Sequence, residues 1–312
     1  MTTVGMFLIL LMGAIVTTTE SGDGCGNSWP LCYGEILPSQ PEVETMIEYS
    51  HRVVSGLLGI MVIILAIWTW PTIGHLRETK LFSILSVFFI VFQGLLGAAA
   101  VIWGQSSAVL ALHFGISLLS LASVFILTVL VFEHDRLGRE YVVPIQKNLR
   151  YQLYALFLFL YIVVYSGALV RHTETSLACA AWPFCNEQQW MPDLNSVASI
   201  PFLHRLLAFA IFIWITILTI QFVRKFQKEK IIVWSASLAF LFVILQIASG
   251  ALVVLTRLNI FLTLAHGFFI SCLFVIISYL LLLASRQSLL AEKQRQAVRL
   301  NENRSQKNPM TE

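Results

Sequence analysis

Long apolar runs separated by short polar segments dominate this chain. Eight runs with few charged residues lie at about 1–17, 51–70, 81–103, 108–132, 150–170, 201–223, 231–255 and 261–285. A helix needs about 20 mostly apolar residues to cross the roughly 30 Å of a bilayer's hydrocarbon core. Backbone groups in lipid must be hydrogen-bonded within the segment, so runs of this length indicate helices rather than barrel strands. The pattern predicts an all-α polytopic membrane protein with eight transmembrane helices.

The first run is the shortest, and a cleaved signal peptide is its alternative interpretation. It has neither a basic segment at its start nor a small-x-small cleavage site. The internal repeat described below also matches it to a full-length fifth run. We therefore expect residues 1–17 to form a span, and we expect the chain to begin several residues into it.

The composition supports a membrane protein and excludes several other classes. Of the 312 residues, 57% are hydrophobic and 12% are charged, and the mean hydropathy is +0.79. Soluble domains carry about 25% charged residues, and half that share leaves a water-facing surface of this size uncovered. The composition also excludes a disordered or collagen-like chain. The net charge of +3 is too small to steer a polyanion, so nucleic acid is not an expected partner.

Lysine and arginine are concentrated on one side of the predicted spans. Most of the 20 basic residues lie in the loops 71–80, 133–150 and 224–230 and in the tail 286–312. Cytoplasmic loops are enriched in Lys and Arg, so we expect both termini to be cytoplasmic and the segments 18–50 and 171–200 to lie outside. The tail is polar, and we expect it to fray into disorder.

The two halves of the chain repeat each other at an offset of 154 residues, which becomes 153 inside the first cysteine loop. The matches are Gly13 with Gly167, Glu20 with Glu174, Cys25 with Cys179, Trp29 with Trp182, Cys32 with Cys185, His51 with His204, Gln93 with Gln246, Gly97 with Gly250 and His113 with His266. We expect two tandem, pseudo-symmetric four-helix bundles in parallel orientation. Their predicted ranges are 1–132 and 150–285, with a cytoplasmic linker at 133–149 and a cytoplasmic polar tail at 286–312.

Four histidines occupy equivalent positions in these predicted bundles. His51 and His113 are 62 residues apart, as are His204 and His266, and each lies near the outer end of a span. Two imidazoles that face each other across a four-helix bundle are a suitable axial ligand pair for haem iron. The alternatives are interhelical hydrogen bonds and a zinc or copper site, although such metals prefer three or four strong ligands.

The other polar residues near these histidines have two interpretations each. Arg52 and Arg205 follow ligand histidines and suit haem propionates, or they extend to the outer headgroups. Gln93 and Gln246 are typical of helix–helix hydrogen bonds. The remaining histidines, His75, His134 and His172, break the repeat and are expected to be solvated. Cys272 is expected to serve packing.

Two cysteine pairs lie in the long outer segments. They are Cys25 with Cys32 and Cys179 with Cys185, and an oxidising compartment favours a local disulfide in each. A short-loop disulfide stabilises the fold by about 2 kcal/mol, which makes a structural role the simpler interpretation. A strained, exposed disulfide near a haem can also exchange electrons.

The repeat is broken at Glu48, whose counterpart is Pro201. Glu48 precedes His51 by three residues, so both lie on one helix face. It can act as a base or stabilise positive charge during chemistry on a bound porphyrin. The alternative is a solvated acid at the end of a loop. This asymmetry predicts a substrate site in the first half and a retained haem in the second.

Several motifs together resemble the haem A synthase family in its Gram-positive bacterial form. They are Gly22-Asp23-Gly24-Cys25-Gly26, Trp29-Pro30-Leu31-Cys32, Glu48-Tyr49-Ser50-His51-Arg52, Leu112-His113-Phe114-Gly115, Tyr165-Ser166-Gly167-Ala168, Val170-Arg171-His172-Thr173-Glu174, His204-Arg205 and Ala265-His266. The resemblance extends over residues 4–285, and the shortened N-terminus is its main departure.

This resemblance implies an oxidoreductase that converts the C8 methyl group of haem O to a formyl group, which gives haem A for a terminal oxidase. It implies haem b on His204 and His266, haem O or haem A on His51 and His113, Glu48 as an essential acid and Cys25 with Cys32 as an outer cysteine pair. The implied location is the bacterial cell membrane. Haem O synthase and an unidentified electron donor are the expected partners, and a homo-oligomer is compatible with the sequence.

Two other functions are compatible with the spacing of the histidines and spans. A membrane cytochrome that only relays electrons would hold the same haem permanently at both sites. A duplicated transporter would break helices near the midplane, and no matching pair of spans carries such a Gly or Pro interruption.

Overall fold

The computed structural model describes residues 1–39, 42–104, 106–137, 141–185 and 191–307, the last 21 of these for the backbone alone. The described helices are α1 (Thr2–Thr18), the short 3-10 helix η1 (Ser21–Asp23), α2 (Val43–Ile73), α3 (Arg77–Ile102), α4 (Ser107–Leu137), α5 (Lys147–His172), α6 (Ser199–Lys225), α7 (Lys230–Leu255) and α8 (Ile260–Lys307). No strand occurs within these ranges. The all-α class is confirmed; the tip of the predicted linker, 138–140, and residues 186–190 of the second cysteine segment lie outside the described residues.

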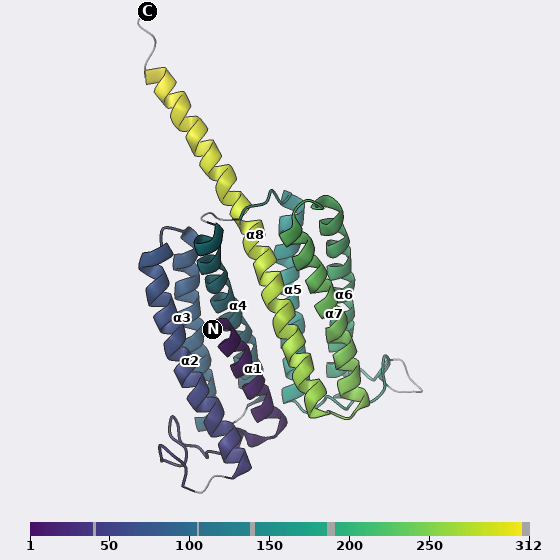
Figure 1. Ribbon diagram of the computed structural model, residues 1–312. Helices are drawn as coiled ribbons and strands as arrows, with labels where there is room; N and C mark the ends of the chain where they lie inside the picture. Colours follow the sequence, from purple (N-terminus) through teal and green to yellow (C-terminus); the bar gives the residue numbers. More distant parts are fainter. Residues whose placement is uncertain (40–41, 105, 138–140, 186–190, 308–312) are drawn as a thin grey trace, which may run out of the picture.

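Seven of the described helices, α2 to α8, are long and apolar enough to cross a membrane. Apolar side chains dominate each of them because lipid solvates such side chains, while the helix satisfies its own backbone groups. The apolar helix α1 has 17 residues and begins about halfway along the bundle (Figure 1). It is shorter than the other spans, so the structure supports seven full-length spans and one short apolar helix.

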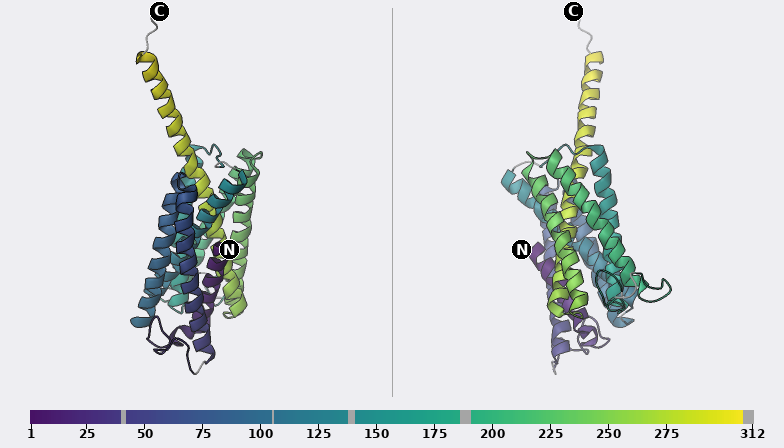
Figure 2. Two further views of the ribbon diagram at one scale, coloured as in Figure 1. Left: turned by 60° about the vertical axis from the view of Figure 1, so that its left-hand side comes forward. Right: turned by 90° about the vertical axis from the view of Figure 1, so that its right-hand side faces the viewer.

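The helices form two rings of four with the same connectivity. In the first half α1 contacts α2, α2 contacts α3, α3 contacts α4, and α4 contacts α1; α5 to α8 repeat this order. Both cysteine segments lie at the same end of the molecule, opposite the end at which α8 extends beyond the other helices (Figure 1 and Figure 2). The predicted pair of four-helix bundles in parallel orientation is confirmed.

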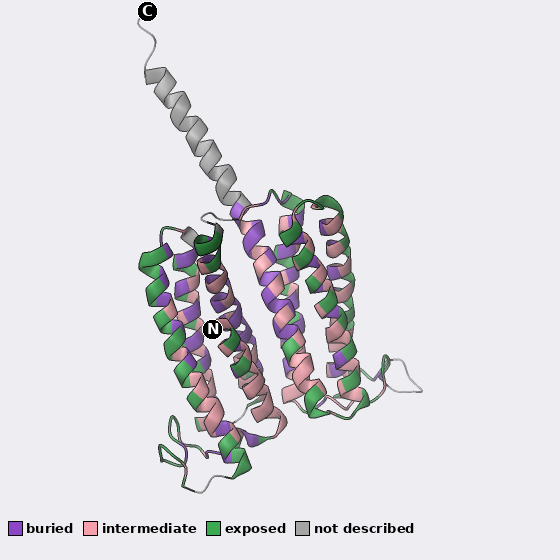
Figure 3. Cartoon of the chain, viewed as in Figure 1, coloured by how far each residue is buried: buried purple, intermediate pink, exposed green. Residues whose placement is uncertain are grey.

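Helices α4 and α8 form the centre of the molecule. Helix α8 contacts α1 and α4 of the first half, and α4 contacts α5 of the second. Both central helices are buried over most of their membrane-spanning length, whereas the outer helices α2, α3, α6 and α7 are mostly accessible (Figure 3). Large apolar side chains cover the accessible faces, for example Leu57, Ile64 and Phe209. Such faces are compatible with lipid rather than water.

Helix α8 does not end where the apolar run ends. It continues to Lys307, so the expectation that the tail frays from residue 286 is wrong for this segment. Residues 286–307 contain no Gly or Pro and are rich in Gln, Ala, Glu, Lys, Arg and Leu. These residue types have high helix propensity, which explains why the helix extends beyond the apolar run.

A buried arginine lies where α8 leaves the bundle. Arg286 is 1% exposed and pairs with Glu78 of α3 at 3.5 Å and with Glu133 of α4 at 2.8 Å. Its Nη1 atom donates to the Tyr141 carbonyl at 3.0 Å. The phenol of Tyr141 in turn donates to Glu229 at 2.7 Å, and burial together with this carboxylate raises the pKa of Tyr141 above its ordinary value. These contacts join the two halves at the end opposite the cysteine segments.

Candidate functional site

The four predicted ligand histidines lie near the beginnings of α2, α4, α6 and α8. His51 is in the third turn of α2, and His113, His204 and His266 are in the second turns of their helices. All four helices begin at the end of the molecule that carries the cysteine segments (Figure 1). His51 lies within electrostatic range of His113, and His204 within range of His266. The structure therefore brings together the two pairs that the spacing predicts.

Each of these histidines faces a glycine on a neighbouring helix of its own bundle. A methyl group at Gly13 would lie 3.3 Å from Cε1 of His51, and one at Gly97 would lie 3.5 Å from Cε1 of His113. In the second half the corresponding distances are 2.8 Å from Gly167 to His204 and 3.0 Å from Gly250 to His266. A β-carbon at Gly167 would push the imidazole aside, one at Gly250 or Gly13 would be a tight contact, and one at Gly97 would make an ordinary van der Waals contact.

The imidazoles of the second half are oriented by hydrogen bonds. Nδ1 of His204 lies 2.8 Å from the Ser166 hydroxyl, and Nδ1 of His266 lies 3.0 Å from the Ser249 hydroxyl and 3.1 Å from the Gln246 carbonyl. The Gln246 amide nitrogen lies 3.0 Å from Nε2 of His266. An amide nitrogen only donates and a carbonyl only accepts, so His266 is a neutral imidazole with its proton on Nδ1 and its lone pair on Nε2. In this arrangement the Gln246 amide occupies the Nε2 lone pair, so the amide has to turn aside before Nε2 binds iron.

The donor set fits haem at both pairs. Two histidines close together near the same end of each apolar bundle, set against glycine backbones, are the groups that bis-histidine haem sites use. Zinc and copper are less suitable, because no group of three or more His, Cys, Asp or Glu side chains occurs in the described part of the chain. The predicted ligand roles remain predictions, and they are taken up under the proposed function.

Glu48 is buried next to the first histidine pair. It is 3% exposed, its Oε2 atom accepts the backbone N–H of Cys25 at 2.7 Å, and its Oε1 atom accepts the Arg52 guanidinium, with Nε at 3.0 Å. The alternative of a solvated acid at the end of a loop is therefore wrong. The sequence predicted that Glu48 lies on the same helix face as His51. The structure shows in addition that Glu48 bonds to the backbone of the first cysteine segment.

Arg52 and Arg205 hold the cysteine segments against α2 and α6. Arg52 donates to the carbonyls of Ser28 at 2.7 Å and Leu31 at 2.8 Å. Arg205 donates to several carbonyls of the second segment, including that of Ala181 at 2.7 Å. Contacts of Arg52 and Arg205 with a haem propionate or with lipid headgroups stay predictions. The sequence did not predict these contacts between the arginines and the cysteine segments. Every residue has a backbone carbonyl, so a residue pattern does not show which carbonyls will accept hydrogen bonds.

Both predicted disulfides are present. Cys25 is bonded to Cys32 and Cys179 to Cys185, and all four cysteines are buried beneath their segments. The free Cys272 is half-buried in α8, in keeping with a packing role.

The remaining histidines divide into an exposed pair and one half-buried residue. His75 and His134 are exposed as expected, with ring centroids 5.4 Å apart. His172 is half-buried and lies within electrostatic range of His113, so the expectation that it is solvated is wrong. The end of α5 is packed against the first half there: the His172 carbonyl accepts the Ser107 hydroxyl at 2.6 Å, and Arg171 donates to the Thr17 carbonyl at 3.0 Å.

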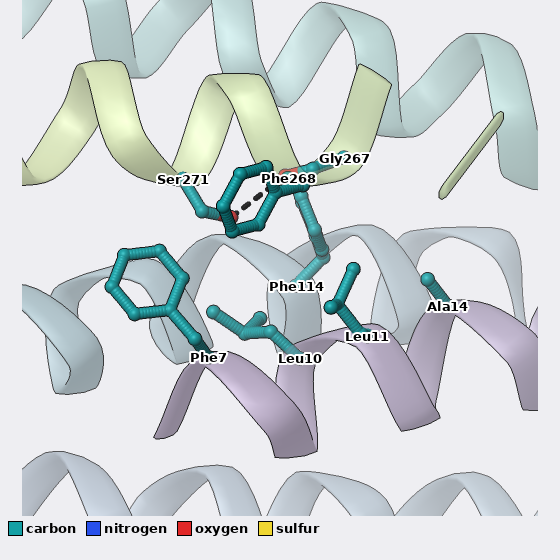
Figure 4. A pocket seen from close by; sticks show the side chains of 8 residues that line it. All are labelled: Phe7, Leu10, Leu11, Ala14, Phe114, Gly267, Phe268 and Ser271. Atoms are coloured by element: carbon teal, nitrogen blue, oxygen red, sulfur yellow. Dashed lines mark hydrogen bonds between the residues drawn. The ribbon is translucent and has the colours of Figure 1, made fainter. Parts of the chain in front are cut away.

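A small apolar pocket lies between the halves, where α1, α4 and α8 meet (Figure 4). Its lining includes Phe114 and Gly267, which directly follow the histidines His113 and His266. Figure 4 shows aromatic and aliphatic side chains pointing into it and the Ser271 hydroxyl turned back to the Gly267 carbonyl, a bond of 2.7 Å. The lining has no titratable side chain, so this pocket offers no acid–base chemistry of its own.

Fold and site define a duplicated, all-helical membrane protein with a histidine pair at the same end of each bundle. Residues 1–278 match the model of the cytochrome oxidase assembly protein family, COX15-CtaA. The chain therefore belongs to this family.

Three proteins similar to this chain are each named haem A synthase. The chain is 50% identical over 285 residues to a haem A synthase of Geobacillus kaustophilus, a match that covers 91% of this chain and 90% of that protein. It is 46% identical over 286 residues to a haem A synthase of Halalkalibacterium halodurans, covering 92% and 95%. A third, the haem A synthase of Bacillus licheniformis, is 47% identical over 286 residues, with 91% and 94% covered.

Proposed function

We propose that this protein is a haem A synthase, an oxidoreductase that converts the C8 methyl group of haem O to a formyl group and supplies haem A to a terminal oxidase. Relatives at 46–50% identity over nine tenths of the chain carry that name. The observation that carries the proposal is the buried carboxylate of Glu48, one turn before His51, in a chain with Pro201 at the matching position. Two otherwise equivalent sites thus differ in a group capable of acid–base chemistry.

The substrate belongs to the first half and the cofactor to the second. His51 and His113 would hold haem O and then haem A, and His204 and His266 would hold haem b. Haem b, when bound, supplies one-electron exchange. In the second half the hydrogen bonds to Ser166, to Ser249 and to the Gln246 carbonyl hold both imidazoles through Nδ1.

Glu48 is the proposed catalytic residue. Its carboxylate is held by the Cys25 N–H and by Arg52, which orients it beside His51. There it would accept a proton or stabilise positive charge as the methyl group is oxidised. Conversion of a methyl to a formyl group takes two successive oxidations, so the enzyme also requires an oxygen source and an electron path that includes haem b.

The proposed location is the bacterial cell membrane, with both termini cytoplasmic and the histidine pairs and cysteine segments near the outer face. The basic residues of the short loops support this orientation. Haem O synthase and an electron donor are the proposed partners, and a homo-oligomer is compatible with the exposed apolar faces of the outer helices.

Extraction of the haem from detergent-purified protein tests the function. We expect haem B together with haem O or haem A, identified by chromatography and mass. Haem B alone at two per chain, even when haem O is supplied, would instead establish a cytochrome that relays electrons between two equivalent sites.

Substitution of the histidines tests the assignment of the halves. His204→Ala and His266→Ala should remove haem B, whereas His51→Ala should remove haem O and haem A; His75→Ala is a matched control on an exposed histidine. If His204→Ala retains haem B and loses only the substrate haem, the assignment is reversed.

A further inference from the structure

The second-half histidines are supported by two serines with the same geometry. The hydroxyl of Ser166 donates to the Val163 carbonyl at 2.7 Å and lies 2.8 Å from Nδ1 of His204. The hydroxyl of Ser249 donates to the Gln246 carbonyl at 3.1 Å and lies 3.0 Å from Nδ1 of His266. Each serine directly precedes the glycine that faces the same imidazole.

These contacts set the direction of both hydrogen bonds. A hydroxyl has one proton, and in each serine that proton is given to the carbonyl three residues earlier. With the proton directed to that carbonyl, the serine oxygen accepts from the imidazole in the tautomer that carries its hydrogen on Nδ1 and its lone pair on Nε2. A histidine that ligates metal usually donates its other nitrogen in this way, which fixes the tautomer and ring orientation and makes the ligand more basic.

The first half has no equivalent of either serine. Met12 stands at the position of Ser166 and Leu96 at the position of Ser249, and neither side chain has a hydroxyl group. Within the described part of the chain, Nδ1 of His51 and Nδ1 of His113 have no hydrogen-bond partner of ordinary geometry, although the Gln93 carbonyl lies near His113. The first-half imidazoles also lie farther from the glycines that face them. A β-carbon on the glycine would lie 3.3 and 3.5 Å from the imidazole Cε1 atoms in the first half, and 2.8 and 3.0 Å in the second.

We propose that Ser166 and Ser249 are positioning residues that make the second-half haem a retained cofactor, and that Met12 and Leu96 leave the first-half ligands loose enough to exchange substrate and product. This inference rests on the proposed function, because it explains how one duplicated bundle came to hold haem permanently while the other releases it. An imidazole that is already oriented pays no ordering entropy when it binds iron. A first-half imidazole without such a partner is held less firmly as the haem enters and leaves.

Haem transfer from the full-length purified protein to excess apomyoglobin tests the proposal. In Ser166→Ala, Ser249→Ala and the double variant, haem B should leave at least roughly tenfold faster than in the wild type, in line with the usual effect of removing such a partner. The reduction potential of the remaining haem B should rise, because a less basic imidazole stabilises ferric iron less. Ser278→Ala is the matched control, since Ser278 is a buried α8 serine that donates only to the Phe274 carbonyl.

Two further variants separate positioning from a general loss of packing. Ser166→Thr and Ser249→Thr keep the hydroxyl and should restore slow release and the wild-type potential. Leu96→Ser places a hydroxyl beside His113, and it should slow the release of haem O and haem A from the first half. A merely structural role for the serines would move neither the potential nor the first-half release.

The outcomes distinguish this inference from the proposed function. If the double alanine variant releases haem B at the wild-type rate with an unchanged potential, the serines are not positioning residues, whatever the enzyme does. If His204→Ala leaves the retained haem in place, the second half is not the cofactor site, and the proposed function fails in its assignment before the serines are considered.

Discussion

Glu48 and Arg52 lie four residues apart on α2, a spacing that places two side chains on one helix face. Both pack beneath the first cysteine segment, where Arg52 bonds to two carbonyls and Glu48 to one N–H. In the second half Pro201 replaces the acid, and Arg205 donates instead to the carbonyl of Cys179 at 2.5 Å. One carboxylate is therefore the main chemical difference between two similarly docked segments.

At this scale we expect Glu48→Gln to lower the conversion of haem O by roughly 10²-fold or more, because the variant keeps the shape of the side chain and loses the base. The haem B spectrum should be unchanged. Haem A formed per chain in membranes supplied with haem O is the measurement, and Glu44→Gln, an exposed acid one turn earlier, is the control. Loss of the haem B spectrum in Glu48→Gln would show that the acid is structural.

The residue pattern predicted the histidine pairs and Glu48 but not their partners. Because the two halves are duplicated, the equal spacing of the histidines and the replacement of Glu48 by Pro201 can be found from the sequence without a structure. The Ser166 and Ser249 hydroxyls approach histidines 38 and 17 residues away, and such contacts depend on the rotation of one helix against another. A serine in a span is otherwise typical of a backbone-bonded packing residue.

The cysteine segments act as elements in their own right. Each is closed by a disulfide and docked on its helix by an arginine, and the first also carries the N–H that holds Glu48. The Cys25–Cys32 disulfide therefore supports the geometry of the acid as well as the stability of the segment. Poor turnover after its removal has a structural explanation that does not involve electron exchange by the cysteines.

We expect Cys25→Ser with Cys32→Ser to lower conversion and leave haem B in place, because the freed segment no longer orients Glu48. The counterpart, Cys179→Ser with Cys185→Ser, should affect haem B retention and thermal stability first, since no acid depends on that segment. Haem content per chain and the midpoint of thermal unfolding in detergent are the two measurements. Equal effects of both pairs on conversion would argue against a special link to Glu48.

On the scale of the whole molecule, contacts of α4 and α8 hold the two bundles together. The ion pairs of Arg286 with Glu78 and Glu133 join the bundles at the end opposite the cysteine segments. Arg286→Met should reduce the stability by roughly 3 kcal/mol, because Glu78 and Glu133 remain buried without their cation. A lowered midpoint of thermal unfolding in detergent is the expected result. Arg224→Met, on an exposed arginine, is the control, and equal midpoints for the two variants would contradict the prediction.

The orientation in the membrane is a second property of the whole molecule. Alkaline phosphatase fused after Leu194, in the second cysteine segment, should be active because that segment is expected outside. The same enzyme fused after Lys228, between α6 and α7, should be inactive on the cytoplasmic side. Reversed activities would place the histidine pairs near the inner face and overturn the proposed location.

The sequence by itself determined the membrane class, the duplication, the two disulfide pairs, the histidine positions and the place where the repeat is broken. These depend on composition and spacing along one helix, which local physics sets. Only the tertiary structure decided that Arg286 is buried and that His172 lies near His113. It alone decided that the arginines hold loop carbonyls and that serines support only the second histidine pair. Such contacts depend on how helices rotate and pack against each other, and no residue pattern within a single span specifies that.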